Sequence, residues 1–126
     1  MLETHHKDWQ SRKEFAKTLE RRTLKFAVSI LKMSTRLPNA VEAKAVRNQI
    51  TKSGTSVGAN YREANRSRSK ADFKSRIRIC ESELSETQYW MELILEVGWL
   101  TQPDMKSEQD ECGQLLALFS TIARNC

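Results

Sequence analysis

Residues that break helices are scarce in this chain, with four Gly and two Pro among 126 residues. This scarcity argues against an all-β domain, which needs a turn signal roughly every eight to twelve residues. The three cysteines, Cys80, Cys112 and Cys126, are odd in number and lack C-x-x-C spacing. They indicate neither a disulfide framework nor a zinc site, so we expect reduced thiols and no bound metal.

Long apolar runs are also absent, and none approaches the ~20 residues that a membrane-spanning helix requires. Residues 1–12 are rich in charge and include two histidines, unlike the apolar stretch of a signal peptide. We therefore expect a cytoplasmic protein without membrane contact.

Leu, Glu, Lys, Arg, Ala and Ser, which suit long helices, are abundant. Four segments carry apolar or small residues at alternating steps of three and four, the spacing of an amphipathic helix. The four stripes are Leu19, Thr23, Phe26, Ile30, Met33 and Leu37; Val46, Ile50, Ser53, Val57, Asn60 and Ala64; Phe73, Ile77, Cys80, Leu84, Thr87, Met91, Ile94 and Gly98; and Cys112, Leu115, Leu116, Phe119 and Ile122. A chain of this length can bury its own core. Four such segments predict an all-α, up-down-up-down antiparallel four-helix bundle.

The ends of the segments are marked by a change of period and by breaking residues. Residues 1–14 show no sustained period, so we expect an N-terminal arm there and a four-helix bundle domain over 15–126. Pro38 should end the first helix. Gly98 should end the third, and Pro103 suits the first position of the fourth.

Two pairs of residues have the spacing of helix caps. Asn39 and Glu42 predict a capping box at the start of the second helix, and Ser69 with Asp72 predicts a serine cap on the third. Asp72 would also lie near the positive end of that helix.

Gly54 and Gly58 interrupt the second helix, where each costs about 1 kcal/mol relative to alanine. A close approach of another backbone would compensate, either at a helix crossing inside the fold or at a contact between subunits. Tyr61 and Trp90 lie at the edges of their apolar stripes. Together with the two glycines, they form our predicted oligomer interface.

Asn60 is a polar residue in the apolar stripe of the second helix and needs a hydrogen-bond partner if it is buried. Candidate partners on the third helix are Ser82, Glu83 and Glu86, and Glu63 can join the same set. We predict a structural network that fixes helix register rather than an active site.

The chain is basic overall, with a formal charge of +5. Seven basic residues gather around the expected turn between the second and third helices, against Glu63 and Asp72. These predicted nucleic-acid-binding residues are Arg62, Arg66, Arg68, Lys70, Lys74, Arg76 and Arg78. Such a cluster favours contacts to RNA or DNA phosphates that are salt-sensitive and indifferent to base sequence.

Other charges divide between the first helix and the C-terminal half. Four cations on one side of the first helix are expected to extend the basic surface: Arg22, Lys25, Lys32 and Arg36. From Glu81 to Glu111 there are nine acidic residues against Lys106 alone. This polarity suits nucleic acid at one end, and it equally suits pairing between subunits.

No constellation of an enzyme is visible, because catalysis needs a nucleophile, an acid/base pair or a metal cage. His5 and His6 read as an incidental pair. The acidic residues near Asp104 lack the glycine and the oxygen spacing of a calcium loop. We expect a non-enzymatic protein without cofactors, acting as a nucleic-acid-binding adaptor or as a protein-interaction scaffold.

Three motifs carry a resemblance to a known family. They are Gly58-Ala59-Asn60-Tyr61-Arg62-Glu63-Ala64, Ser69-x-x-Asp72-Phe73, and Glu86-x-x-Tyr89-Trp90-x-Glu92-Leu93. Over residues 19–124 the chain resembles the bacterial four-helix-bundle proteins first noticed as open reading frames in intervening sequences of 23S rRNA genes. Ala64 and Arg66 stand where many members have glycine.

The resemblance implies a four-helix subunit that assembles with itself, as a pentamer in relatives. It also extends to the accessory proteins of diversity-generating retroelements, whose basic barrels bind nucleic acid and partner with a reverse transcriptase. RNA or DNA, a reverse transcriptase or another protein, and further copies of the chain are therefore the partners that the resemblance implies.

Overall fold

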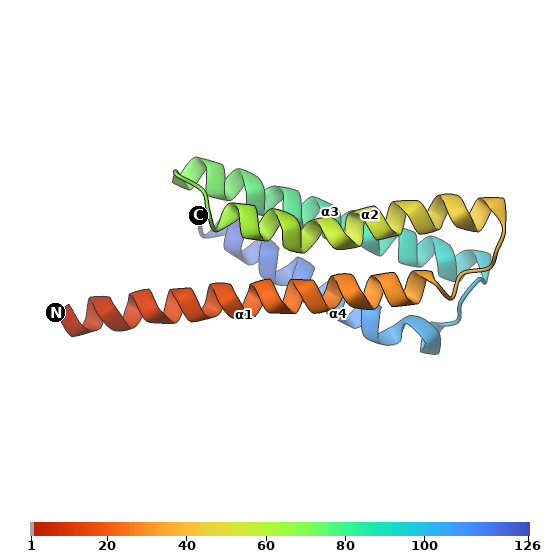
Figure 1. The fold of residues 1–126 in the computed structure, drawn as a ribbon, viewed down its shortest axis with the longest axis horizontal. Coiled ribbons are helices and arrows are strands. Elements are labelled where there is room, and N and C mark those ends of the chain that lie inside the picture. Colours follow the sequence, from red (N-terminus) through yellow and green to blue (C-terminus); the bar gives the residue numbers. More distant parts are fainter. Residues whose placement is uncertain (1) are drawn as a thin grey trace.

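The computed structural model describes residues 2–126, with side chains described from residue 8 onward. Four helices follow one another: α1 (Leu2–Ser34), α2 (Val41–Ala64), α3 (Lys70–Val97) and α4 (Gln102–Arg124). They run alternately in opposite directions along one long axis (Figure 1), and the described part of the chain contains no strand. Helices adjacent in sequence pack most extensively, and α1 also contacts α4. The predicted all-α four-helix bundle is confirmed.

Helix α1 begins earlier than its apolar stripe does. It starts at Leu2 and passes without interruption through the segment that we expected as an arm. This first part projects beyond the other three helices (Figure 1), and Trp9 and Phe15 on it are 59% and 49% exposed. Because no neighbouring helix covers it, no periodic apolar pattern is needed there. The expected pair His5 and His6 lies outside the described side chains.

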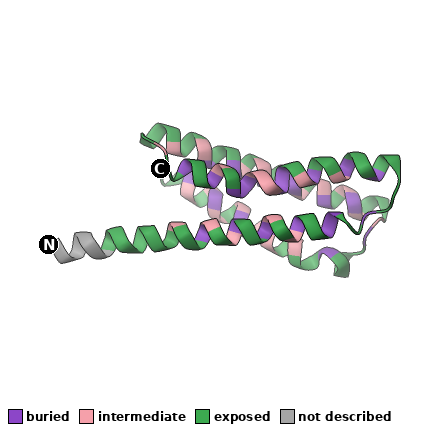
Figure 2. Ribbon diagram, viewed as in Figure 1, coloured by how far each residue is buried: buried purple, intermediate pink, exposed green. Residues whose placement is uncertain are grey.

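The core follows the predicted stripes. All six positions of the first stripe are buried, and the buried residues of the four helices face one another (Figure 2). In the second stripe Asn60 is the exception, because it is only half-buried and Tyr61 takes the core position beside it. An α-helix has 3.6 residues per turn, so either of two neighbouring positions can occupy the buried face at a given turn. At this turn of α2 Tyr61 occupies it, and the next stripe position, Ala64, is buried again.

The start of α3 confirms its predicted cap. The side chain of Ser69 accepts a hydrogen bond from the backbone N–H of Asp72 at 3.0 Å. At the other end Gly98 adopts a φ of 85° and ends the helix as predicted. This left-handed conformation is one that glycine adopts at little cost.

The predicted cap of α2 is wrong. Its N-cap residue is Ala40, whose carbonyl oxygen accepts from the N–H of Lys44 at 2.9 Å, and no side chain caps the helix. A tertiary contact holds this connection instead. Arg47 donates hydrogen bonds to the backbone oxygens of Ser34, Leu37 and Pro38. Asn39 therefore stands one residue too early to be the cap.

The start of α4 is held by Thr101 and Asp104. The Asp104 carboxylate accepts from the backbone N–H of Thr101 at 2.9 Å and from its hydroxyl at 2.7 Å. Both bonds lower the pKa of Asp104. Pro103 is the second residue of the helix rather than the first, a position where its missing N–H is equally tolerated.

Candidate nucleic-acid interface

The α2–α3 corner, residues 65–69, is a tight turn held by backbone hydrogen bonds. The N–H of Arg66 donates to Glu63 O at 3.0 Å, and the N–H of Ser67 donates to Ala64 O at 3.0 Å. No described residue other than Gly98 has a positive φ. The corner therefore has no backbone conformation that requires glycine, which fits Ala64 and Arg66 there.

Most of the predicted cations of this corner are exposed and unpaired. Arg78 pairs with Glu81 at 2.8 Å, and Arg76 lies 4.0 Å from Asp72. The hydrogen bonds from Ser120 and Arg78 lower the pKa of Glu81, which keeps its carboxylate charged. The other five cations are exposed and form no ion pair within the described part of the chain: Arg62, Arg66, Arg68, Lys70 and Lys74.

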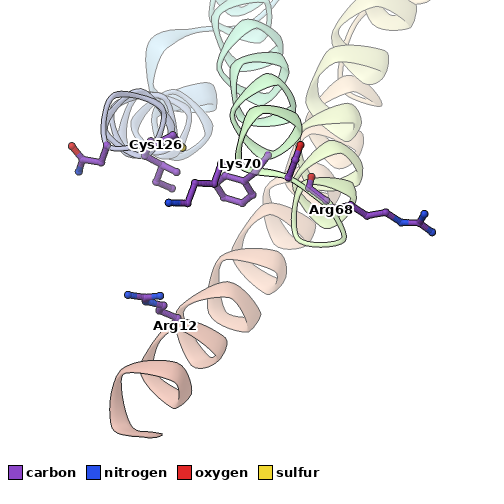
Figure 3. A pocket seen from close by; sticks show the side chains of 9 residues that line it. Arg12, Arg68, Lys70 and Cys126 are labelled. Atoms are coloured by element: carbon purple, nitrogen blue, oxygen red, sulfur yellow. Dashed lines mark hydrogen bonds between the residues drawn. The ribbon is translucent and has the colours of Figure 1, made fainter. Parts of the chain in front are cut away.

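Arg12 on α1 joins these cations at the same end of the bundle. A hollow of about 850 Å³ lies between the first part of α1, the α2–α3 corner and the end of α4. Its lining residues are Arg12, Ser67, Arg68, Ser69, Lys70, Phe73, Ile122, Asn125 and Cys126. In Figure 3, Arg12 and Lys70 extend toward the same side, and Arg68 points away from them.

A second hollow of about 470 Å³ adjoins the first, with Arg12, Phe73 and Ile122 lining both. Phe15 and Tyr61 add further apolar surface to it. Arg12 was not among the predicted site residues, because the sequence around it has no period that marks a helix. The alternation of Trp9, Arg12, Lys13 and Phe15 was the signal that could have found it.

The expected extension of the basic surface along α1 is wrong for two of its four residues. Arg22 donates hydrogen bonds to both carboxylate oxygens of Glu111, which raises the arginine pKa. Arg36 lies 3.5 Å from the Glu108 carboxylate and donates to the backbone oxygen of Asp104. These contacts join α1 to α4, so part of the acidic stretch is neutralised inside the subunit.

Gly54 and Gly58 lie where α1 crosses α2. A Cβ at Gly54 would lie 2.8 Å from Cγ2 of Ile30, and one at Gly58 would lie 3.0 Å from Oγ1 of Thr23. The small residues therefore serve a crossing inside the fold, one of the two readings that the sequence left open. Their assignment to the oligomer interface is wrong, because both are buried against α1.

The other two predicted interface residues differ from each other. Tyr61 is 2% exposed and packs edge-on against Phe119, with ring centroids 5.4 Å apart, so its interface assignment is also wrong. Trp90 is half-buried, donates to Glu86 at 3.3 Å and contacts the exposed ring of Tyr89. Its place in an interface stays a prediction.

The predicted polar network is not formed among the described residues. Asn60 donates to the backbone oxygen of Ser56 in its own helix at 2.9 Å. Three members are exposed: Glu63, Ser82 and Glu86. Glu83 is half-buried, and burial raises its pKa. The Asn60 amide is therefore bonded within α2, and no hydrogen bond joins it to the described residues of α3.

Buried polar contact between α2 and α3 comes from other residues. The hydroxyls of Thr87 and Ser53 lie 2.8 Å apart and share a hydrogen bond, and both residues are buried. The thiol of Cys80 lies 3.4 Å from the backbone oxygen of Val57 and donates to it. These contacts occupy the interface that Asn60 was expected to fix.

The described residues contain no group of three or more His, Cys, Asp or Glu side chains placed to hold a metal ion. None of the described helices has a stretch that is both long and apolar enough to cross a membrane.

Comparison with known proteins identifies the family. The model of the 23S rRNA-intervening sequence protein family matches residues 16–121. A crystal structure of a protein of unknown function from the S23 ribosomal protein family of Bacteroides thetaiotaomicron is 34% identical, with a TM-score of 0.77. The alignment covers 82% of this chain and 96% of that one. Among curated proteins, none matches the chain. The family model and the shared fold together show that the chain belongs to the 23S rRNA-intervening sequence protein family.

Proposed function

We propose that this protein binds RNA or DNA through the phosphate backbone, at the end of the bundle that carries the α2–α3 corner. The observation that carries the proposal is the group of five exposed cations there without an ion pair among the described residues: Arg62, Arg66, Arg68, Lys70 and Lys74. A cation already paired with a carboxylate, such as Arg22, must break that ion pair before it can bind a phosphate. The five unpaired cations can bind phosphates without this cost.

The physical basis is the release of counterions. Each phosphate that a Lys or Arg neutralises frees condensed cations, so affinity falls steeply with salt. Backbone contacts position a protein on nucleic acid and carry no direct sequence information. The protein would therefore act as an adaptor with little base preference, and self-assembly would repeat the corner and strengthen binding.

A second candidate function is that of a protein-interaction scaffold. It is supported by an exposed apolar row on α1, formed by Leu24, Val28 and Leu31 at helical spacing. The same row is the surface through which copies of the chain would associate. Assembly into a pentamer and pairing with a reverse transcriptase rest on the family resemblance and belong to the same proposal.

The test is binding of labelled duplex DNA, single-stranded DNA and RNA by fluorescence anisotropy, from about 50 to about 200 mM salt. Wild-type protein should bind all three, with a slope of about −0.9 per neutralised phosphate on a log-log plot for duplex DNA. Reversing Arg66 and Arg68 to Glu should weaken binding at least about tenfold and flatten the slope by about two.

The matched control reverses Lys44 and Lys52, two exposed cations on α2 away from the corner, to Glu. It changes the net charge by the same amount at a different place. If both double variants lost binding equally, net charge rather than the corner would be responsible. If wild-type protein bound nothing at about 50 mM salt, the scaffold function would lead, and light scattering of Leu24→Glu and Val28→Glu would test it.

A further inference from the structure

The two hollows beside the α2–α3 corner combine apolar walls with cations, a combination that a duplex backbone does not need. Phe73 and Ile122 line both hollows, and Phe15 lines the second. Arg12 lines both as well, and Lys70 borders the first. In a duplex the base faces are stacked inside, so a protein meets phosphates and base edges but no free base face. An unpaired nucleotide presents a base face and a phosphate together.

The aromatic residues around Arg12 are accessible. Phe15 borders the hollow and is half-exposed, and Trp9, nearly two turns earlier, is more exposed still. The ammonium of Lys13 lies 5.1 Å from the Trp9 ring centroid, and both residues line a third hollow that shares Arg12. Basic residues interleaved with exposed aromatic rings form the kind of surface on which single strands stack.

Ser67 gives an independent indication of a ligand. Its hydroxyl oxygen is buried and has no hydrogen-bond partner within the described part of the chain, although nearly all buried polar atoms have one. Ser67 lines the same hollow as Arg12 and Lys70. An oxygen of a bound phosphate would give this hydroxyl its missing partner.

The volumes fit such a ligand. The hollows measure about 850 and 470 Å³, within the roughly 300–1,000 Å³ of typical small-ligand sites. They adjoin each other, so a base and its phosphate can occupy neighbouring parts. The charge is complementary, because all the charged residues that line these two hollows are basic.

We propose that these hollows bind unpaired nucleotides of a single strand. A phosphate would contact Arg12, Lys70 and the Ser67 hydroxyl, and a base would lie against Phe15 and Phe73. The inference rests on the proposed function, since it names the form of nucleic acid that the basic end selects.

The experiment compares three ligands of about 20 nucleotides, longer than one binding site: oligo(dT), an abasic single strand with the same phosphates, and a duplex. Wild-type protein should bind oligo(dT) at least about fivefold more tightly than the abasic strand, because only the former can stack. Phe15→Leu should remove that difference. Arg12→Glu should weaken binding of both single strands. Val97→Ala, at an exposed apolar position at the opposite end of α3 from the corner, is the control and should preserve the difference.

A second measurement uses the wild-type chain and so does not depend on any variant folding. Cys126 is exposed and lines the first hollow, whereas Cys80 and Cys112 are buried. Oligo(dT) should slow modification of Cys126 by a thiol reagent more than the duplex does at equal saturation. Equal binding of all three ligands, with equal protection, would overturn the single-strand site and leave the phosphate-binding function standing.

Two other outcomes are also decisive. If no ligand bound at all, the proposed function and this site would fall together. If Cys126 became protected as protein concentration rose, without nucleic acid, a second copy of the chain would occupy the hollow. That result would also overturn the proposal.

Discussion

Arg22 of α1 and Glu111 of α4 form a two-pronged ion pair. The arginine Nε lies 2.8 Å from Oε2, and its Nη2 lies 2.7 Å from Oε1. The residues are 89 positions apart in sequence, and the same guanidinium also donates to Gln114. Of the helix pairs that pack together, α1 and α4 have the smallest contact. The Arg22–Glu111 ion pair is therefore a large part of the interaction between these two helices.

Breaking this pair should destabilise the bundle. We expect a coupling free energy of about 1 kcal/mol in a double-mutant cycle of Arg22→Gln and Glu111→Gln, measured by urea unfolding. The side chains are 34% and 30% exposed, against 70% and 57% for Lys106 and Asp110. That more exposed pair is the control and should couple by about 0.3 kcal/mol. Equal coupling in the two cycles would contradict the prediction.

Gly54→Ala should destabilise the protein by about 1–3 kcal/mol, because the new methyl group would overlap Ile30. Gly113→Ala is the matched control, since a Cβ there would meet nothing described within 4 Å. The control should stabilise the protein by up to about 1 kcal/mol through helix propensity. In an Ile30→Ala background the penalty at Gly54 should shrink. Thermal unfolding of the wild type, the three single variants and the double variant checks both the loss at Gly54 and the gain at Gly113.

Thr87→Val should cost about 1–2 kcal/mol, because it leaves the buried Ser53 hydroxyl without its partner across the α2–α3 interface. Adding Ser53→Ala removes both polar groups. The double variant should therefore be less destabilised than the sum of the single variants. Strict additivity in urea unfolding would show that the two hydroxyls do not act together.

Only one of the three cysteines should react quickly with a thiol reagent. Cys126 is exposed, whereas Cys80 and Cys112 are buried and donate to the backbone oxygens of Val57 and Leu84. Burial raises the pKa of both buried thiols to about 12, which further suppresses the reactive thiolate. Absorbance titration should show one fast thiol, absent in Cys126→Ala, and two that appear on unfolding.

The same two thiols predict a loss of stability in alkali. Their pKa rises from 9.0 to about 12 on folding, so their contribution to stability is complete below pH 9. As the pH rises from 9 toward 12, the unfolded thiols ionise and the folded ones do not. The free energy of unfolding should then fall by at most about 1.4 kcal/mol per pH unit for each thiol.

Comparison with a Cys80→Ala, Cys112→Ala variant isolates this effect. Burial also raises the pKa of Tyr61, which contributes to the same alkaline loss in both proteins. The variant should show the shallower fall between pH 9 and 11. Parallel curves would contradict a role for the thiols.

Features that depend on near neighbours in the chain were readable from the sequence. The buried stripe from Leu19 to Leu37, the Ser69 cap and the Gly98 stop were all predicted and are all present. Helical periodicity repeats within one turn, and a cap joins residues three apart. Such patterns are fixed by short-range geometry, whatever else the chain packs against.

Features that depend on distant partners were decided by the tertiary structure. Gly54 and Gly58 signalled a close approach, but only the packing of Ile30 and Thr23 places it inside the subunit. Arg22 was predicted as part of a basic surface, but in the folded chain it forms an ion pair with Glu111 of α4. The sequence around Arg12 has no apolar period, because the first part of α1 projects past the other helices and none of them covers it (Figure 1).

The sequence by itself determined four amphipathic helices and a basic corner, because local periodicity and charge are properties of adjacent residues. The tertiary structure decided which cations remain unpaired, which helix the small residues pack against, and that Asn60 bonds within its own helix. Those outcomes depend on the rotation of each helix about its axis. That rotation is set by side chains packing across helices, over separations that no local pattern encodes.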